Sequence, residues 1–86
     1  MGSISWNPTK SKRLLKTRGI SFEKIIEQKL LATILHPERD NQRILVFEYK
    51  NYCWAVPCVM SGDNVFLKTI YPSRKLTKRY LEKEAL

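Results

Sequence analysis

The architecture of this chain is encoded in residues 43–71, RILVFEYKNYCWAVPCVMSGDNVFLKTIY. Three runs rich in β-branched and aromatic residues, a composition typical of strands, span residues 43–50, 52–60 and 65–71. Asn51 and the Ser-Gly-Asp-Asn sequence at 61–64 separate the runs and favour tight turns. We therefore expect a three-stranded antiparallel meander. Pro57 should cause a bulge or an interruption in the second strand, because proline has no N–H to donate.

The sequence before this meander contains residue patterns that are typical of helices. Residues 4–6 can form a short strand or an extended lead-in. Asn7 then provides an N-cap, with Pro8 in the first helical position. We expect this first helix to end near Arg18, because Gly19 favours the left-handed conformation that closes helices.

A second helix is expected after Ser21, which would be its N-cap. Four apolar residues follow at the spacing of one buried helical face: Phe22, Ile25, Ile26 and Leu30. A loop at 36–41 leads into the first strand of the meander. A last helix should begin after the Pro72-Ser73 break. The pattern predicts an α+β domain in which two N-terminal helices and a basic C-terminal helix cover one face of a three- or four-stranded antiparallel sheet.

The length of the chain, 86 residues, predicts a single domain over residues 1–86. Hydrophobic residues make up 43% of the sequence, which is enough for a folded core. The apolar run at 30–35 is far too short to span a bilayer, so no membrane partner is expected. No apolar segment of the secretory type follows Met1, and we therefore expect a cytoplasmic protein.

Cysteine and histidine usage predicts neither a disulfide nor a metal. Cys53 and Cys58 lie five positions apart in one expected strand, and this odd spacing sends their side chains to opposite faces. The chain has one histidine, so a zinc site would lack ligands. We expect no cofactor.

The net charge of +8 is concentrated in two segments. Residues 1–22 and residues 64–81 each contain five cations and no acid, whereas residues 23–63 contain five cations and six acids. If the two ends of the chain pack together, the basic segments form one surface suited to a polyanion, with nucleic acid favoured over a membrane. The same asymmetry is also typical of basic helices that are simply well solvated.

The beginning of the last helix is the most specific part of this charge pattern. Ser73 is its natural N-cap, and Arg74 and Lys75 occupy its first turn. Cations at this end oppose the helix dipole, so their presence indicates an anionic ligand such as phosphate. We expect Arg74 and Lys10, from the first helix, to meet in a common pocket.

Three segments, taken in order, resemble the BrnT toxins of the wider RelE/ParE superfamily of bacterial toxin–antitoxin modules. They are Trp-Asn-Pro-Thr-Lys at 6–10, Arg-Gly-Ile-Ser-Phe-Glu at 18–23, and Ser-Arg-Lys at 73–75. The chain departs from the family where Arg18 replaces a usual histidine, Asn7 replaces a common acid and Lys75 replaces a second arginine. These differences indicate a divergent branch.

The resemblance implies a RelE-like fold and a metal-independent ribonuclease that cuts RNA and blocks translation. It also implies a cognate antitoxin that holds the enzyme inactive. Arg74 would grip the phosphate as negative charge develops on it, since a guanidinium can bind two oxygens at once. Lys75 would assist, and Lys10 would add charge or exchange a proton. These three residues are the expected catalytic group.

Further residues are expected to bind RNA: Lys68, Lys78, Arg79, Tyr71 and Arg18. Two residues are candidates for the acid or base. Glu23 can serve as a base, or as a helix-start residue paired with Arg18. His36 is a side chain of the type that titrates near neutral pH, but its position before Pro37 favours a structural loop residue over an acid or base.

Two other functions remain open from the sequence. One is a non-catalytic nucleic-acid-binding module that uses the same cations for phosphate contacts. The other is a ParE-like toxin that inhibits a topoisomerase and leaves RNA intact. Apart from any of these functions, Arg74 could be a surface arginine that forms a local salt bridge, and Lys75 could be an ordinary solvated lysine.

Overall fold

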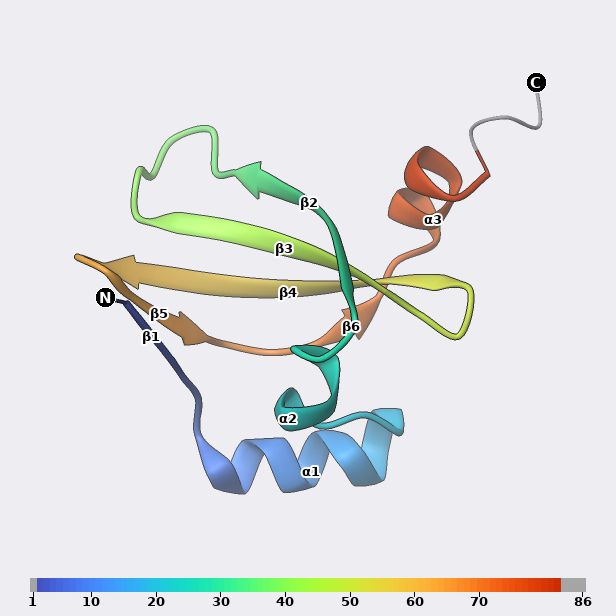
Figure 1. Ribbon diagram of the computed structural model, residues 1–86, viewed down its shortest axis with the longest axis horizontal. Helices are drawn as coiled ribbons and strands as arrows, with labels where there is room; N and C mark the ends of the chain where they lie inside the picture. The colour runs from blue at the N-terminus through green and yellow to red at the C-terminus, as the bar shows by residue number, and fades with distance from the viewer. Residues whose placement is uncertain (1, 83–86) are drawn as a thin grey trace.

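The computed structural model describes residues 2–82, which form one mixed sheet with three helices (Figure 1). The strands are β1 (Ser3–Ser5), β2 (Lys29–Leu35), β3 (Gln42–Tyr49), β4 (Tyr52–Ser61), β5 (Asn64–Leu67) and β6 (Tyr71–Pro72). The helices are α1 (Pro8–Arg18), α2 (Phe22–Ile25) and α3 (Arg74–Tyr80). The strand order is β1-β5-β4-β3-β2, and β6 pairs with β4 beyond the end of β5. The expected α+β class is confirmed.

The central meander β3-β4-β5 is antiparallel, as the sequence predicts. β3 and β4 pair without interruption, and a two-residue turn joins them. Lys50 and Asn51 in this turn have φ angles of 54° and 61°, which is the left-handed geometry that matches the twist of a tight hairpin. Local turn chemistry therefore sets the register of the two longest strands.

Pro57 interrupts one side of β4, also as predicted. On this side β4 pairs with β5 from Cys58 onward and with β6 at 54–55, so that residues 56–57 are skipped. The Pro57 carbonyl still accepts a hydrogen bond from the Lys68 amide at 2.9 Å. The expected third strand is consequently divided into β5 and β6.

Helix α1 has the predicted boundaries. The Asn7 side chain accepts hydrogen bonds from the amides of Thr9 and Lys10, at 2.9 and 3.1 Å. Gly19 closes the helix with a φ of 77° and donates its amide to the Leu15 carbonyl. Both ends of α1 are therefore fixed by the residues on which its prediction rests.

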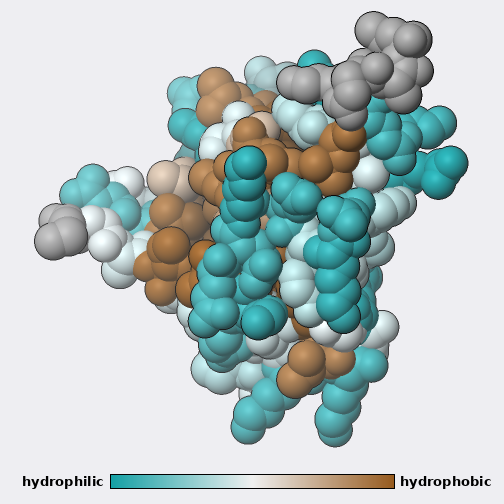
Figure 2. Space-filling view, turned by 45° about the vertical axis from the view of Figure 1, so that its right-hand side comes forward, coloured by the Kyte–Doolittle hydropathy of each residue, from teal (hydrophilic) through white to brown (hydrophobic). Residues whose placement is uncertain are grey.

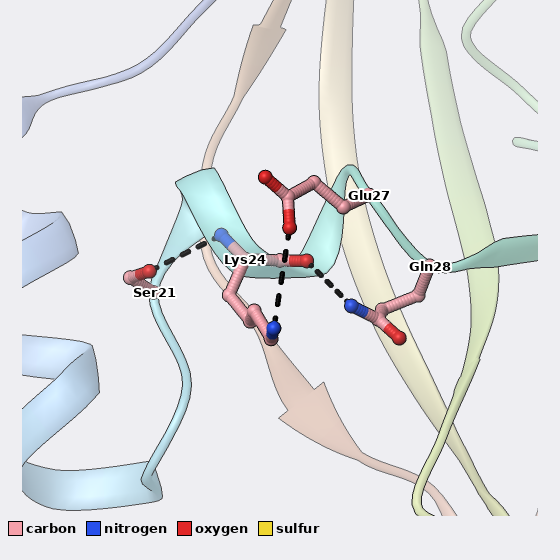
Figure 3. Close-up of polar contacts among 4 residues, drawn as sticks. All are labelled: Ser21, Lys24, Glu27 and Gln28. Carbon is pink, nitrogen blue, oxygen red and sulfur yellow. Dashed lines mark hydrogen bonds and ion pairs between the residues drawn. The ribbon is translucent and has the colours of Figure 1, made fainter.

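Helix α2 is only one turn long (Figure 3). Ser21 caps it by accepting a hydrogen bond from the Lys24 amide at 3.2 Å. Gln28 turns back and donates its side-chain amide to the Lys24 carbonyl at 3.0 Å, beside an ion pair between Lys24 and Glu27. The Lys24 carbonyl also accepts the Glu27 amide at 3.2 Å, so two donors hold it at the point where the chain leaves the helix.

The prediction that the second helix continues through Leu30 is wrong. Residues 29–35 form β2, an edge strand paired with β3, and Leu30 is 49% exposed instead of buried. A short apolar run fits either a helix or a strand, and here pairing with the neighbouring strand determines the outcome. β2 supplies one edge of the sheet.

The sheet also differs from the expected three or four antiparallel strands. β1 adds to β5 in parallel, with Ile4 opposite Val65. This pair joins segments about sixty residues apart, so no local turn signal announces it. The N-terminal strand sets where α1 begins beneath the sheet (Figure 1).

Contrary to the prediction, the three helices do not all cover the same face of the sheet. Trp54, Val56 and Cys58 of β4 point to the face that packs against α1 and α2, in a core that also holds Phe22 and Ile25. The alternate residues of β4 point to the opposite face, where α3 packs. Burying each large apolar side chain contributes roughly 1.5–3 kcal/mol, so both faces stabilise β4.

Helix α3 is attached to β4 by a buried hydroxyl. Thr77 is 3% exposed, and its Oγ1 accepts a hydrogen bond from the Cys53 amide at 2.8 Å. The same hydroxyl donates to the Ser73 carbonyl at 2.8 Å, and the Ser73 amide donates to the Cys53 carbonyl. Ser73 also caps α3 through the Leu76 amide, as predicted.

Both cysteines are buried and free. Their alternation along β4 places Cys58 in the core beneath α1 and α2, and Cys53 on the α3 face. The prediction that they lie on opposite faces is confirmed. Within residues 2–82, none of the helices has the length and apolar character needed to cross a membrane.

Candidate nucleic-acid interface

A cleft of about 370 Å³ lies where the beginning of α1 meets the ends of β3 and β4. Its lining residues are Lys10, His36, Gln42, Arg43, Ile44, Pro57, Cys58, Lys68 and Thr69. Three cations from separate parts of the chain stand beside an apolar wall. This volume is in the range of small-ligand pockets, roughly 300–1,000 Å³.

None of the residues that line the cleft within the described range, 2–82, is a carboxylate. Glu38 and Asp40 belong to the neighbouring loop, but neither forms an ion pair with Arg43. Among residues 2–82 the one ion pair is that between Lys24 and Glu27, which belongs to α2. The cleft is therefore electropositive and suited to an anion.

The guanidinium of Arg43 is held by its own loop. Its Nη1 donates to the carbonyl of Asp40 and, at 3.1 Å, to the carbonyl of Gln42. Both acceptors are neutral, so these contacts fix the side chain without cancelling its charge. A guanidinium has five N–H donors, and the remaining ones are available to a ligand.

His36 fixes the other end of this loop. Its Nδ1 accepts hydrogen bonds from the amides of Glu38 and Arg39, each at 3.1 Å. In the neutral ring the proton is therefore on Nε2, which can donate a hydrogen bond but cannot accept a proton. This arrangement supports the structural interpretation of His36 and gives it a donor in the cleft.

The buried thiol of Cys58 forms part of the apolar wall. Burial raises the pKa of this thiol above its ordinary value of 9.0, although contacts with Arg43 act in the opposite direction. Cys58 is only 1% exposed, so desolvation outweighs the nearby charge. The thiol stays neutral at physiological pH and has no nucleophilic role.

A second group of cations lies on α3, and we call it the C-terminal basic face: Arg74, Lys75, Lys78 and Arg79. All four are exposed. Their spacing places them on one side of the helix, opposite the side on which Thr77 packs against β4. Arg79 also lies 5.8 Å from the centre of the Tyr80 ring.

Arg18 connects α1 to the segment that leads into α3. Its Nη1 donates to the carbonyl of Ile70 at 2.9 Å, four residues before Arg74. Tyr71 follows in β6 and is partly exposed. The two basic segments therefore meet at two places: at this contact, and in the cleft that Lys10 and Lys68 both line.

Contrary to the prediction, Lys10 does not share a pocket with Arg74. It lines the cleft together with Lys68 and His36, and Arg74 is not among the cleft residues. Figure 1 shows the beginning of α1 at the lower left and α3 at the upper right, with the sheet between them. The sequence-predicted cations are divided between the cleft and the C-terminal basic face.

Glu23 has a structural position. Its carboxylate accepts hydrogen bonds from the Ser11 hydroxyl at 2.6 Å and from the Trp6 indole at 3.3 Å. The Ser11 bond is the main cause of a lowered pKa of Glu23, and this makes the carboxylate a weaker base. The alternative pairing with Arg18 is wrong, because the Arg18 guanidinium bonds to Ile70 instead.

The site residues predicted from the sequence include Lys10, His36 and Lys68 of the cleft but not Gln42 or Arg43. Arg43 opens the first strand of the meander, where it was treated only as a strand residue. Its pairing opposite Cys58 could have identified Arg43, because this register places a cation at the edge of the core. That signal depends on knowing the hairpin register.

Figure 2 shows hydrophilic side chains over most of the face on the α3 side of Figure 1, interrupted by a band of apolar side chains. Residues 2–82 contain no group of three or more His, Cys, Asp or Glu side chains that could hold a metal ion. The expectation of a protein without a cofactor stays a prediction.

No protein-family model and no curated protein matches the sequence. A solved structure does match: the 1.1 Å crystal structure of the Brucella abortus ribonuclease toxin BrnT. The TM-score is 0.63 and the sequence identity 16%, and the match covers 85% of this chain and 97% of that chain. The chain therefore has a BrnT-like fold, as the resemblance implies.

Proposed function

We propose that this protein is a metal-independent endoribonuclease toxin of a bacterial toxin–antitoxin module, within the RelE/ParE superfamily. It would cut RNA in the cytoplasm, inhibit translation and growth, and be held inactive by a cognate antitoxin. The main observation behind the proposal is that, among residues 2–82, the exposed cations of α3 and the cations of the cleft form no ion pair with a carboxylate, on a BrnT-like fold. Such a surface binds a phosphate backbone.

The proposed reaction is transesterification at one phosphodiester. The 2′-oxygen of a ribose loses its proton and bonds to the adjacent phosphorus, and the bond from phosphorus to the 5′-oxygen breaks as that oxygen gains a proton. The products are a 2′,3′-cyclic phosphate and a free 5′-hydroxyl. This transesterification requires neither an oxidant nor a metal.

Arg74 is the proposed phosphate-binding residue at the reacting centre, and Lys75 assists it. Arg18 and Tyr71 contribute contacts nearby, since the Arg18 bond to Ile70 holds α1 close to this segment. Lys78 and Arg79 continue the C-terminal basic face along α3 and bind the flanking backbone. Lys10 and Lys68 act from the cleft as RNA-binding residues.

A second candidate is a non-catalytic nucleic-acid-binding module. It is favoured by the engagement of both acid–base candidates: Glu23 bonds to Ser11 and Trp6, and His36 bonds through Nδ1 to its own loop. In that case the same cations bind RNA and no strand is cut.

Incubation of the purified protein with single-stranded RNA in the presence of a chelator distinguishes these functions. We expect fragments ending in 2′,3′-cyclic phosphate, and Arg74→Ala should abolish them without changing the circular dichroism spectrum. Arg13→Ala, an exposed arginine on α1, is the matched control. Intact RNA at high protein concentration rejects the nuclease. Salt-sensitive RNA binding would then support the binding module, and blocked DNA supercoiling without RNA loss would indicate a ParE-like toxin.

A further inference from the structure

We infer that the cleft is a binding site for a single unpaired nucleotide, with Arg43, Lys10 and Lys68 on its phosphate and the apolar wall against its base. This deepens the proposed function and rests on it only in taking the nucleotide to be part of an RNA strand. The site is separate from the C-terminal basic face.

The cations of the cleft fit a phosphate group. Arg43 comes from β3, Lys10 from α1 and Lys68 from the segment after β5, so three separate parts of the chain each bring a cationic residue to the lining of one cleft. The neutral carbonyls that hold Arg43 leave its charge intact and keep the guanidinium in place before a ligand arrives. A guanidinium fixed in this way binds phosphate with little loss of side-chain freedom.

The wall of the cleft fits a nucleobase. Ile44, Pro57 and the neutral thiol of Cys58 give an apolar surface next to the cations. A flat base can cover such a surface, while its edges bond to polar groups. Gln42 supplies a side-chain amide with both donor and acceptor, and His36 supplies Nε2–H.

The base must be unpaired to reach this wall, because a paired base is stacked and its edge is occupied. The inferred substrate class is therefore single-stranded RNA, with the cleft contacting one nucleotide of the strand apart from the C-terminal basic face. An acidic peptide would satisfy the cations but would leave the apolar wall and the amide without a matching partner.

The loop between β2 and β3 keeps the cleft assembled. His36 Nδ1 and Arg43 Nη1 together bond to four backbone groups between residues 38 and 42. The His36 amide also donates to the Gln42 carbonyl at 3.2 Å. Two residues that line the cleft thus also hold its rim, so ligand binding should require little rearrangement.

Titration of the ¹⁵N-labelled protein with adenosine 5′-monophosphate tests this site directly. We expect amide shifts at residues 36–44 and 67–69, and weaker effects from adenosine or inorganic phosphate alone. Lys68→Met should weaken binding by about three- to fivefold, as loss of one exposed charge contact predicts. Lys29→Met, in β2 opposite Glu48 at the far end of β3, should leave the affinity within about twofold.

Three outcomes would overturn the inference: shifts confined to residues 74–80, equal affinity of the two lysine variants, or tighter binding of an acidic hexapeptide at the same residues. The nuclease assay is independent of these readouts. Cleft shifts with uncut RNA would uphold the nucleotide site and reject the nuclease. RNA cleavage without amide shifts at the cleft would support the nuclease and reject the nucleotide site.

Discussion

The guanidinium of Arg18 donates a hydrogen bond to the carbonyl of Ile70 at 2.9 Å, across 52 positions of sequence. This contact joins the end of α1 to the strand segment that leads into α3. Ile70 itself is fully buried, so its carbonyl has limited access to water.

Arg18→Ala should lower the free energy of unfolding by about 1 kcal/mol, since it removes a charged hydrogen-bond donor from a backbone carbonyl. Urea denaturation measures this change. Arg13→Ala, on the same helix, should change stability by less than about 0.5 kcal/mol. Equal stability of the two variants would mean that the Arg18 bond makes no net contribution.

Thr77→Val should destabilise the protein by about 1–3 kcal/mol, because it leaves the buried Cys53 amide without its acceptor. Valine has nearly the same shape as threonine, so the packing against β4 is kept. Thr77→Ser retains the hydroxyl and is the matched control. Thermal unfolding monitored by circular dichroism gives the comparison, and a valine variant as stable as the serine variant would refute this role.

The lowered pKa of Glu23 makes stability depend on acid. A carboxyl group with a lowered folded-state pKa stabilises the fold above its ordinary value of 4.5. That contribution is lost as the pH falls through the folded-state pKa. Between about pH 6 and about pH 3, the wild-type protein should therefore lose more stability than Glu23→Gln. Urea midpoints across this range test the prediction, and parallel curves would contradict it.

Both thiols should be inert in the native protein. Burial raises the pKa of Cys53 and of Cys58, and each is at most 1% exposed. Ellman's reagent at about pH 8 should react with neither thiol until guanidinium is added. Their neutral forms stabilise the fold below 9.0, and this contribution is lost as the pH rises through the higher folded-state pKa. Rapid reaction of a native thiol would show that β4 opens readily.

The C-terminal basic face should dominate the salt dependence of RNA binding. Replacing Lys78 and Arg79 together by alanine should reduce the slope of log affinity against log salt by about 1.4 for single-stranded RNA, at about 0.7 per phosphate contact. Fluorescence anisotropy of a labelled oligonucleotide measures the slope. Lys29→Ala should leave it unchanged, and an unchanged slope in the double variant would remove α3 from the interface.

Local signals predict much of this fold. The Asn7 cap, the Gly19 stop and the turns at 50–51 and 61–64 are short-range chemistry, and each element they bound is present. Long-range pairing is not encoded in that way. The sequence of residues 29–35 is compatible with a helix, and it forms a strand because it pairs with β3. β1 likewise forms by pairing with β5, which is far away in the sequence.

The site was predictable to a similar degree. Charge counting identifies the cations, but their grouping depends on which face of the sheet each helix covers. β4 is apolar at nearly every position, in Cys53 and Ala55 as well as in Trp54 and Val56, and this indicates burial on both faces. That signal would have placed α3 opposite α1, and it would have separated Arg74 from Lys10.

The Thr77 hydroxyl makes α3 a rigid extension of β4 and not a freely moving tail. Because α3 holds its cations in place before RNA binds, complex formation should cost little conformational entropy. Calorimetry of RNA binding should then give a small heat-capacity change, and the association rate should be set by electrostatic steering and not by coupled folding.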